Sequence, residues 1–241
     1  MVFNQNLWLR RKRGIEAGTL AVGSSVYLME SGSVAEYLVV NQGIPGSSRW
    51  YDSSCDGTWL LRKKTYAMLK WHWQDMNNYE TSDIHTFLNN TFIGMFDSNM
   101  QSAIKQVKIP YRKNAGSSTV VTSGADGLST KIFLLSATEA GFNHNYMPAN
   151  EGAELDYFRG SKDEGAFAGR IAYSELGYVS RWYLRSPYAS TDTGIFGVTL
   201  VGDQGDSYGV YASTSAGIRP ALIIPATAYF DEDTRLFKGG A

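Results

Sequence analysis

Short apolar runs alternate with clusters of small polar residues along most of the chain. The chain has 25 Gly but only 6 Pro, and Gly, Ser, Asn and Asp gather between the apolar runs. Such spacing is typical of many short β-strands joined by turns. The predicted strands are Val26–Met29, Tyr37–Asn41, Trp59–Arg62, Val107–Pro110, Lys131–Leu135, Arg181–Arg185, Phe196–Val201, Ser207–Ala212 and Arg219–Ile224.

Helical spacing is less frequent. Ser82 is a favourable N-cap, and the apolar residues behind it recur at helical spacing, at Ile84, Phe87, Leu88 and Phe92. A second, shorter helix is predicted over Asn99–Gln106. The sequence Ser136-Ala137-Thr138-Glu139 fits a capping box, which predicts one helical turn after the strand Lys131–Leu135.

The run Gly202-Asp203-Gln204-Gly205 joins the seventh and eighth strands in a predicted hairpin, where Gly can take a positive φ. The predicted fold class is therefore α+β, strand-dominated, with two or so helices and long irregular loops. In this prediction residues 1–18 are an N-terminal arm, residues 19–228 are the domain, and residues 229–241 are a polar C-terminal tail.

Charge and composition exclude several classes of protein. The net charge is −1, which argues against a protein that coats nucleic acid through many phosphate contacts. Cys55 is the single cysteine, so neither a disulfide framework nor a multi-cysteine zinc site is expected. No apolar run approaches the ~20 residues that span a bilayer, and the N-terminus lacks the apolar core of a signal peptide. We expect no nucleic-acid partner and no membrane span.

Motifs for catalysis are weak. The run Gly205-Asp206-Ser207-Tyr208-Gly209 matches the nucleophile-elbow pattern, but no histidine follows it, because the last one is His144. His72, His85 and His144 share no metal-ligand spacing. We therefore expect a protein that is not an enzyme, with no catalytic residue, no cofactor and no metal site.

Acidic residues lie in one Gly-rich turn and beside the single cysteine. Asp203 and Asp206 flank a Gly-rich turn, which is either a plain turn or a place for a calcium ion. Acids beside Cys55 are expected to raise the pKa of its thiol, which disfavours a reactive thiolate.

Residues Tyr188–Gly217 differ in composition from the rest of the chain. They contain no Lys, Arg, Glu, Met, Trp, His, Asn, Pro or Cys, and their single Gln is Gln204. Tyrosine and phenylalanine are interleaved with Gly, Ser, Thr and Asp, a mixture that antibody binding loops also use. The segment is either a binding surface or an ordinary Gly-rich hairpin region.

Two signatures bracket this segment. Trp182-Tyr183-Leu184-Arg185-Ser186-Pro187 precedes it and Gly217-Ile218-Arg219-Pro220-Ala221-Leu222 follows it. We expect two core strands that close around an irregular insert. Arg185 and Arg219 are expected to hydrogen-bond backbone carbonyls or a buried acid, since a semi-buried Arg needs partners.

This frame resembles the C-type-lectin-like domains of gut bacteria and their phages, which are distantly related to formylglycine-generating enzymes. Glu36–Val40, Cys55–Arg62 and Lys131–Ser136 support the resemblance, which covers roughly residues 20–226. Some members of that family are variable proteins of diversity-generating retroelements. Those systems mutate template adenines, and the resulting codons cannot encode Lys, Glu, Gln, Met or Trp, types that are nearly absent from Tyr188–Gly217.

The resemblance implies a C-type-lectin-like fold and a non-enzymatic ligand- or receptor-binding protein, displayed on a phage particle or a bacterial cell surface. The variable segment would be residues 183–217, with Trp182, Arg185, Arg219 and Pro220 as its scaffold. The implied ligand-binding residues are Tyr183, Thr191, Asp192, Thr193, Ile195, Phe196, Thr199, Leu200, Asp206, Ser207, Tyr208, Tyr211 and Ser213. The implied partner is a protein or glycan on a host or target surface.

The sequence differs from related families in several motifs, and it also allows one alternative function. One cysteine cannot supply the pair that formylglycine-generating enzymes use for copper, and the calcium–sugar motifs of animal lectins are absent. The alternative is a fixed structural or decoration subunit of a phage virion with a lectin-like fold. In that case the basic run Arg10-Arg11-Lys12-Arg13 and the apolar residues before it would dock the arm on a virion neighbour or a second copy. The other interpretations of this run are a contact with nucleic acid and a solvated basic arm.

Overall fold

The computed structural model describes residues 14–46, 49–113, 120–142, 150–160, 167–190 and 195–239, with the backbone alone at residues 189–190 and 195–198. Two five-stranded sheets dominate this part of the chain, with strand orders β10-β17-β4-β3-β2 and β15-β14-β13-β16-β5. The first contains β2 Ser25–Glu30, β3 Ser33–Gln42, β4 Thr58–Arg62, β10 Ile132–Phe133 and β17 Ala221–Ile224. The second contains β5 Met68–Lys70, β13 Trp182–Ser190, β14 Ile195–Val201, β15 Ser207–Val210 and β16 Ser215–Gly217.

The predicted strands are confirmed in position. Each of them overlaps an observed strand, although Lys131–Leu135 contains only the two-residue β10. The described elements also include the short strand pairs β6 Val107–Ile109 with β9 Leu128–Thr130, β7 Tyr111–Arg112 with β8 Val121–Thr122, and β11 Ala172–Tyr173 with β12 Val179–Ser180. Short 3₁₀ turns lie at Ala17–Thr19, Ser53–Cys55, Tyr79–Thr81, Gly124–Asp126, Asp156–Phe158 and Ala168–Arg170. The strand-rich α+β class is therefore confirmed.

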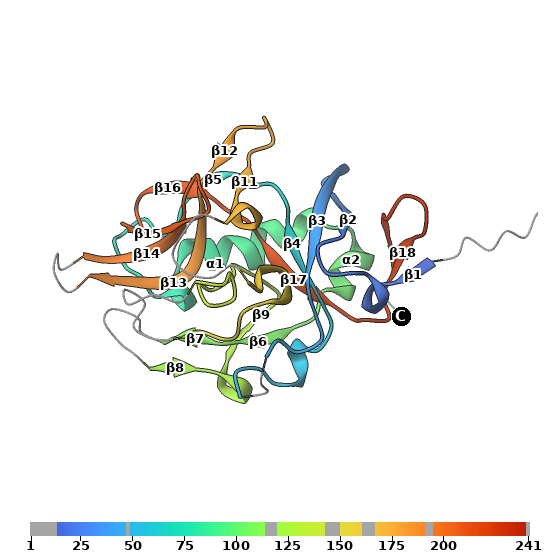
Figure 1. Ribbon diagram of the computed structural model, residues 1–241, viewed down its shortest axis with the longest axis horizontal. Helices are drawn as coiled ribbons and strands as arrows, with labels where there is room; N and C mark the ends of the chain where they lie inside the picture. The colour runs from blue at the N-terminus through green and yellow to red at the C-terminus, as the bar shows by residue number, and fades with distance from the viewer. Residues whose placement is uncertain are drawn as a thin grey trace, which may run out of the picture.

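The first sheet forms the centre of the core. All five residues of β4 and all four of β17 are buried, as expected for strands covered on both faces. The Trp59 ring of β4 packs edge-on against Tyr51 and Phe133, with ring centroids 5.6 Å apart in both pairs. In Figure 1 the strands β13–β16 lie toward the left end of the molecule and β1 and β18 toward the right, with β3, β4 and β17 between them.

The helix predicted after Ser82 is present but changes its pitch. Ser82 Oγ accepts from the His85 N–H at 3.2 Å, so the predicted N-cap is confirmed. The helix α1 Asp83–Phe87 continues as a π-helical turn, Leu88–Phe92, and a 3₁₀ turn, Ile93–Met95. Inside the π-turn, Asn89 Oδ1 accepts from the Ile132 N–H at 3.1 Å, and this bond joins the helix to β10.

The second helix, α2 Ser98–Ala103, ends three residues before the predicted Gln106. Ile104 is extended, and the Lys105 N–H donates to the Ile223 carbonyl of β17 at 2.9 Å. A hydrogen bond to a distant strand thus replaces the last helical turn. Among the described helices none is long and apolar enough to cross a membrane.

Two neighbouring chain segments join the two large sheets. Residues 62–68 lead from β4 to β5, and residues 217–221 lead back from β16 to β17. The segments are bonded to each other: Tyr66 N–H donates to the Ile218 carbonyl and Ile218 N–H donates to the Ala67 carbonyl, both at 2.9 Å. We call this pair of segments the strap; it fixes the second sheet to the core.

The expected arm and tail are partly built into the fold. The strand β1 Gly14–Glu16 pairs with β18 Tyr229–Asp231, which pairs with β19 Phe237–Gly239. Residues 14–18 and 229–239 therefore do not form a free arm and tail. The sequence did not predict this pairing because its residues are mostly polar. A single fully buried side chain, Phe230, attaches β18 to the core. The basic run at residues 10–13 lies outside the described residues.

Candidate functional site

A β-bulge in β13 turns a charged side chain into the core. β13 pairs with β14 on both sides of the bulge, but Leu184–Ser186 oppose the single residue Thr199. Inside the bulge, the Arg185 N–H donates to the Leu135 carbonyl at 2.9 Å. Bulges commonly redirect side chains in this way, and here the Arg185 side chain points at the segment that carries the capping box.

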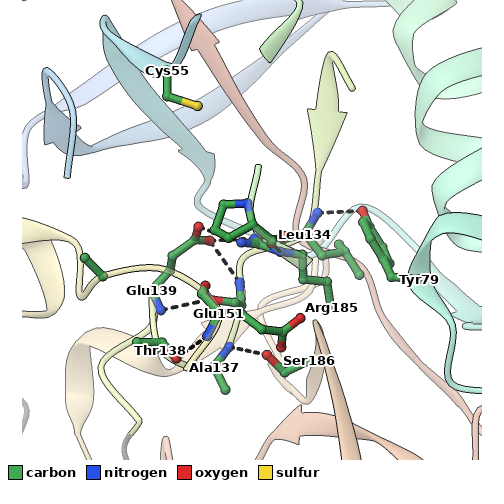
Figure 2. A network of polar contacts seen from close by, with 12 residues as sticks. Cys55, Tyr79, Leu134, Ala137, Thr138, Glu139, Glu151, Arg185 and Ser186 are labelled. Atoms are coloured by element: carbon green, nitrogen blue, oxygen red, sulfur yellow. Dashed lines mark hydrogen bonds and ion pairs between the residues drawn. The ribbon is translucent and has the colours of Figure 1, made fainter. Parts of the chain in front are cut away.

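Arg185 and Glu139 form a fully buried ion pair (Figure 2). Arg185 Nη1 lies 2.6 Å from Glu139 Oε2, and Nη2 lies 2.7 Å from Oε1. Tyr51 Oη donates to the same carboxylate at 3.0 Å. Arg185 also donates to the carbonyls of Leu134 and Pro110, at 2.8 and 3.1 Å. The expectation that Arg185 bonds backbone carbonyls and a buried acid is confirmed, and this bidentate geometry is the most specific that Arg offers.

The predicted capping box holds Glu139 in place. Ser136 N–H donates to Glu139 Oε2 at 2.9 Å, and Glu139 N–H donates to Ser136 Oγ at 3.0 Å. Ala140 N–H donates to the Ser136 carbonyl at 3.0 Å and closes one helical turn. Both predictions for this segment are therefore confirmed. The capping box here also presents a core carboxylate to Arg185.

A second buried carboxylate, Glu151, lies beside this pair. Its Oε1 accepts from the Arg112 N–H at 3.1 Å, and Ser136 Oγ donates to the Glu151 carbonyl at 2.7 Å. Burial raises the pKa of Glu151, against the opposing charges of Arg185 and Arg112. These side chains are all buried, so they contact one another and not a solute. The network therefore positions β13 and does not itself bind a substrate.

The two bracketing signatures meet at Trp182 and Arg219. Trp182 pairs with Gly217, and the Arg219 guanidinium lies 4.9 Å from the centroid of the Trp182 ring. Arg219 Nε donates to the Arg62 carbonyl at 2.7 Å, and the Arg62 N–H donates to the Pro220 carbonyl at 2.9 Å. Burial lowers the pKa of Arg219 to about 10, so the group is charged at neutral pH. The expected carbonyl bond of Arg219 is thus confirmed, and it lies within the strap.

The predicted hairpin between β14 and β15 is confirmed. Gly205 N–H donates to the Gly202 carbonyl at 3.2 Å, and Gly202 N–H donates to the Asp206 carbonyl at 2.8 Å. Gly205 has φ +79°, and a Cβ there would lie 2.3 Å from the Phe167 carbonyl oxygen. A type I turn followed by one left-handed residue is a common hairpin loop, and it needs Gly at that residue.

One face of this hairpin lines a groove of about 500 Å³, which we call the hairpin groove. Its lining comes from β14 and β15, from the β11–β12 hairpin, and from β5 and β16, together with Arg181, Asp203 and Thr214 beside these strands. Met68, Tyr178 and Val179 on its margin are 59%, 72% and 46% exposed, respectively. The lining residues are Met68, Ser174, Tyr178, Val179, Ser180, Arg181, Leu200, Asp203, Tyr208, Val210, Thr214, Ser215 and Ala216.

Arg181 and Asp203 are the charged members of this lining, and they pair with each other at 3.2 Å. The Arg181 guanidinium also lies 5.8 Å from the centroid of the Tyr208 ring. Burial raises the pKa of Tyr208, against the charge of Arg181, so the phenol is neutral at physiological pH. The rest of the groove presents apolar and hydroxyl groups. Such a surface suits binding by contact and hydrogen bonding.

The implied ligand-binding residues are distributed unevenly. Tyr208 and Leu200 line the hairpin groove. Asp206 and Ser207 are half-buried beside it, whereas Tyr211, 49% exposed, and Ser213 follow β15. Ile195 and Phe196 lie in β14, where only the backbone is described. Thr191, Asp192 and Thr193 lie outside the described residues.

Burial changes the role of three implied contact residues. Tyr183 and Thr199 are fully buried and Leu200 is 2% exposed. Tyr183 Oη donates to the Thr214 carbonyl, so its hydroxyl is used inside the fold. Tyr183 and Thr199 therefore support the sheet rather than contact a ligand, and Leu200 contributes only to the floor of the groove. The strand register places Tyr183, Leu200 and Tyr208 in one cross-strand row.

Sequence reasoning missed the opposite wall of the groove. Tyr178 and Val179 come from the β11–β12 hairpin, and Met68 comes from β5, far away in the chain. The available signal was the run Leu176-Gly177-Tyr178-Val179, where apolar residues flank a turn glycine; Leu176 is 83% exposed.

The remaining candidate groups are engaged in local contacts. Cys55 is fully buried, and burial, with a smaller contribution from Asp52, raises the pKa of its thiol to about 11. His72 Nδ1 lies 2.9 Å from Asp83 Oδ2, and burial lowers the pKa of His85. His144 lies outside the described residues. No three His, Cys, Asp or Glu side chains gather like metal ligands in the part of the chain that the structure describes.

The fold and site together define a strand-rich α+β domain with a buried polar network and a surface groove whose charged residues are Arg181 and Asp203. The chain belongs to a family described as a domain of unknown function, DUF6273, whose model matches residues 56–226. This range runs from just before β4 to just beyond β17, so it contains the strap, the hairpin groove and the Arg185, Glu139 and Glu151 members of the buried network, whereas Tyr51 precedes it. No curated protein and no solved structure matches the chain.

Proposed function

We propose that this protein is a non-enzymatic binding protein whose ligand is held in the hairpin groove. The observation that carries the proposal is the position of Tyr188–Gly217, the compositionally distinct segment. Its β14–β15 hairpin lines the groove with Leu200, Tyr208 and Val210. The scaffold below this face is buried and bonded through Arg185 and Arg219, as needed when surface side chains vary on a constant backbone.

We further propose that the domain has a C-type-lectin-like fold and is a variable protein of a diversity-generating retroelement, displayed on a phage particle or a bacterial cell surface. The bracketing signatures support this proposal, because Trp182 of one and Arg219 of the other are buried and contact each other. The partner would be a protein or glycan on a host or target surface.

Sequencing this gene and its flanks across a population of the source organism or phage tests the proposal. We expect variation confined to codons 183–217, at positions such as Tyr208, Val210 and Tyr211, together with a near-copy repeat nearby. The buried Trp182 and Arg185 codons should not vary. An invariant segment without a repeat would instead indicate a fixed virion or lectin-like subunit.

A binding experiment tests the groove directly. Purified protein would be applied to an array of bacterial surface glycans and to a display of surface proteins. For any probe that binds, Tyr208→Ala should weaken affinity by about 2 kcal/mol, roughly 30-fold, as expected for an aromatic anchor. Tyr229→Ala is the matched control, since Tyr229 is also a partly exposed strand tyrosine but lies in β18. Equal loss in both variants would contradict a site in the hairpin groove.

A further inference from the structure

We propose that the partner of the hairpin groove is an extended peptide segment of another protein, which adds as a further strand beside β15. The inference rests on the proposed binding function and specifies its partner class. β15 is the terminal strand in the order β15-β14-β13-β16-β5, so no strand among the described residues pairs with its outer side. Exposed sheet edges are recurrent sites of peptide addition.

The hydrogen-bond phase of β15 shows which backbone groups face outward. Gly202 N–H donates to the Asp206 carbonyl, so the backbone of residue 206 faces β14. The register continues without a shift, with Tyr208 opposite Leu200 and Val210 opposite Val198. In an antiparallel pair this orientation alternates from residue to residue. The N–H and C=O groups of Gly209 therefore face away from β14, toward the place of an added strand.

Side-chain alternation gives the added strand a defined face. Tyr208 and Val210 point to the hairpin groove, whereas Gly209 faces the opposite side. There the Tyr188 ring covers it so closely that a Cβ at residue 209 would lie 2.1 Å from the ring. A strand beside β15 would project alternate side chains over the Tyr208 face, within cross-strand contact distance. Apolar residues at those alternate positions would extend the wall of the groove.

Charge near the turn specifies one end of the peptide. Asp203 pairs with Arg181 at 3.2 Å, and the carboxylate of Asp206 lies against Gly202 in the same turn. Two carboxylates and one guanidinium leave this end of β15 with a net negative charge. The complementary segment is therefore apolar at alternate positions and carries a Lys or Arg near the turn. The same charge disfavours acidic peptides and nucleic acids as partners.

A selection from displayed random peptides tests this inference on the full chain. Peptides of about ten residues, long enough for one added strand, would be selected on the protein and counter-selected on Tyr208→Ala. Selected peptides would then be synthesised with one backbone N-methyl group at each position in turn. We expect about tenfold or greater losses of affinity at every second position, because N-methylation removes one donor and blocks strand pairing.

The outcomes separate the two proposals. Losses of affinity at every second N-methylated position support strand addition. So does enrichment of Lys or Arg in the selected peptides, if that enrichment disappears when selection is repeated on the double variant Asp203→Asn/Asp206→Asn. Peptides that depend on Tyr208 but tolerate N-methylation everywhere would overturn strand addition while leaving groove binding intact. Failure to select any Tyr208-dependent peptide would also overturn it, and glycan binding or codon variation would still report on the proposed function. A dimer that forms through β15 and excludes the peptides would identify a second copy as the occupant and overturn the inference.

Discussion

At the scale of single residues, buried charge defines the rigid part of this domain. The Arg185–Glu139 pair is fully desolvated, and both side chains have further partners. Such a pair adds little net stability compared with an apolar pair of equal volume, but removal of one partner is costly. The network therefore fixes the geometry of β13 more than it stabilises the fold.

Arg185→Met should lower the free energy of unfolding by about 3–5 kcal/mol, because it leaves Glu139 buried without its counter-charge. Urea denaturation followed by circular dichroism measures this loss. Arg181→Met is the control, since Arg181 pairs with Asp203 at an exposed position and its removal should cost less than about 1 kcal/mol. Similar losses in the two variants would mean that burial of the pair is unimportant.

Glycine at residue 209 is a packing requirement. A Cβ there would lie 2.1 Å from Tyr188 Cδ1, so Gly209→Ala must displace the ring or the strand. We expect a loss of about 1–3 kcal/mol, typical of overpacking, measured by urea denaturation. Gly94→Ala is the matched control, because nothing lies within 4 Å of a Cβ at residue 94. A neutral effect at Gly209 would show that the Tyr188 ring moves freely.

At the scale of elements, a charged latch holds the β11–β12 hairpin against the strap. Glu175, in the turn of this hairpin, accepts from Arg62 Nη2 at 2.8 Å and from Lys64 Nζ at 3.4 Å. Arg62 is itself bonded to the buried Glu30 carboxylate at 3.0 Å. The same hairpin carries Tyr178 and Val179, so the latch helps to position one wall of the groove.

Glu175→Gln should speed amide hydrogen exchange within β11–β12 while changing global stability by less than about 1 kcal/mol, because Glu175 is 54% exposed. Burial pushes the pKa of Glu175 up, but the hydrogen bonds and charges of Arg62 and Lys64 outweigh it and leave that pKa below its usual value. The latch is therefore present above the ordinary Glu pKa, about 4.3, and is lost as pH falls through the lowered value. Unchanged exchange in the variant would argue against a latch.

The sequence predicted the positions of individual strands and helix starts better than the contacts between elements that are distant in the chain. Apolar alternation located the strands, and Ser82 and Ser136–Glu139 located helix starts, because those signals depend on neighbours in the chain. Helix α2 ended early because Lys105 bonds distant β17. For the site, Tyr208 was predicted, but the burial of Tyr183 and the wall formed by Tyr178 were not. Both depend on how the sheets pack together.

At the scale of the whole molecule, the buried network and the core sheet form one continuous unit. Trp59 of β4 packs on Tyr51, and Tyr51 donates to the Glu139 carboxylate that binds Arg185. Trp59 Nε1 also donates to the Cys55 carbonyl at 3.1 Å. Cys55 lies near the network (Figure 2), and its Sγ is 3.3 Å from the Lys108 carbonyl oxygen. Exposure of Cys55 therefore requires this shared core to open.

Cys55 should consequently report global unfolding. With its thiol fully buried and a pKa of about 11, we expect labelling by a chromogenic disulfide reagent at pH 8 to be at least about 10³-fold slower than in urea-unfolded protein. The rate should rise with urea in parallel with the unfolding measured by circular dichroism. Arg185→Met should accelerate labelling of the native protein by about 10²-fold or more, because about 3 kcal/mol of lost stability raises the open population by that factor. The variant Cys55→Ser, which has no thiol, gives the background signal of the reagent.

Fast labelling of the native wild type, or no acceleration in Arg185→Met, would contradict this prediction. Either result would show that Cys55 is reached by a local opening that leaves the Arg185–Glu139 pair intact.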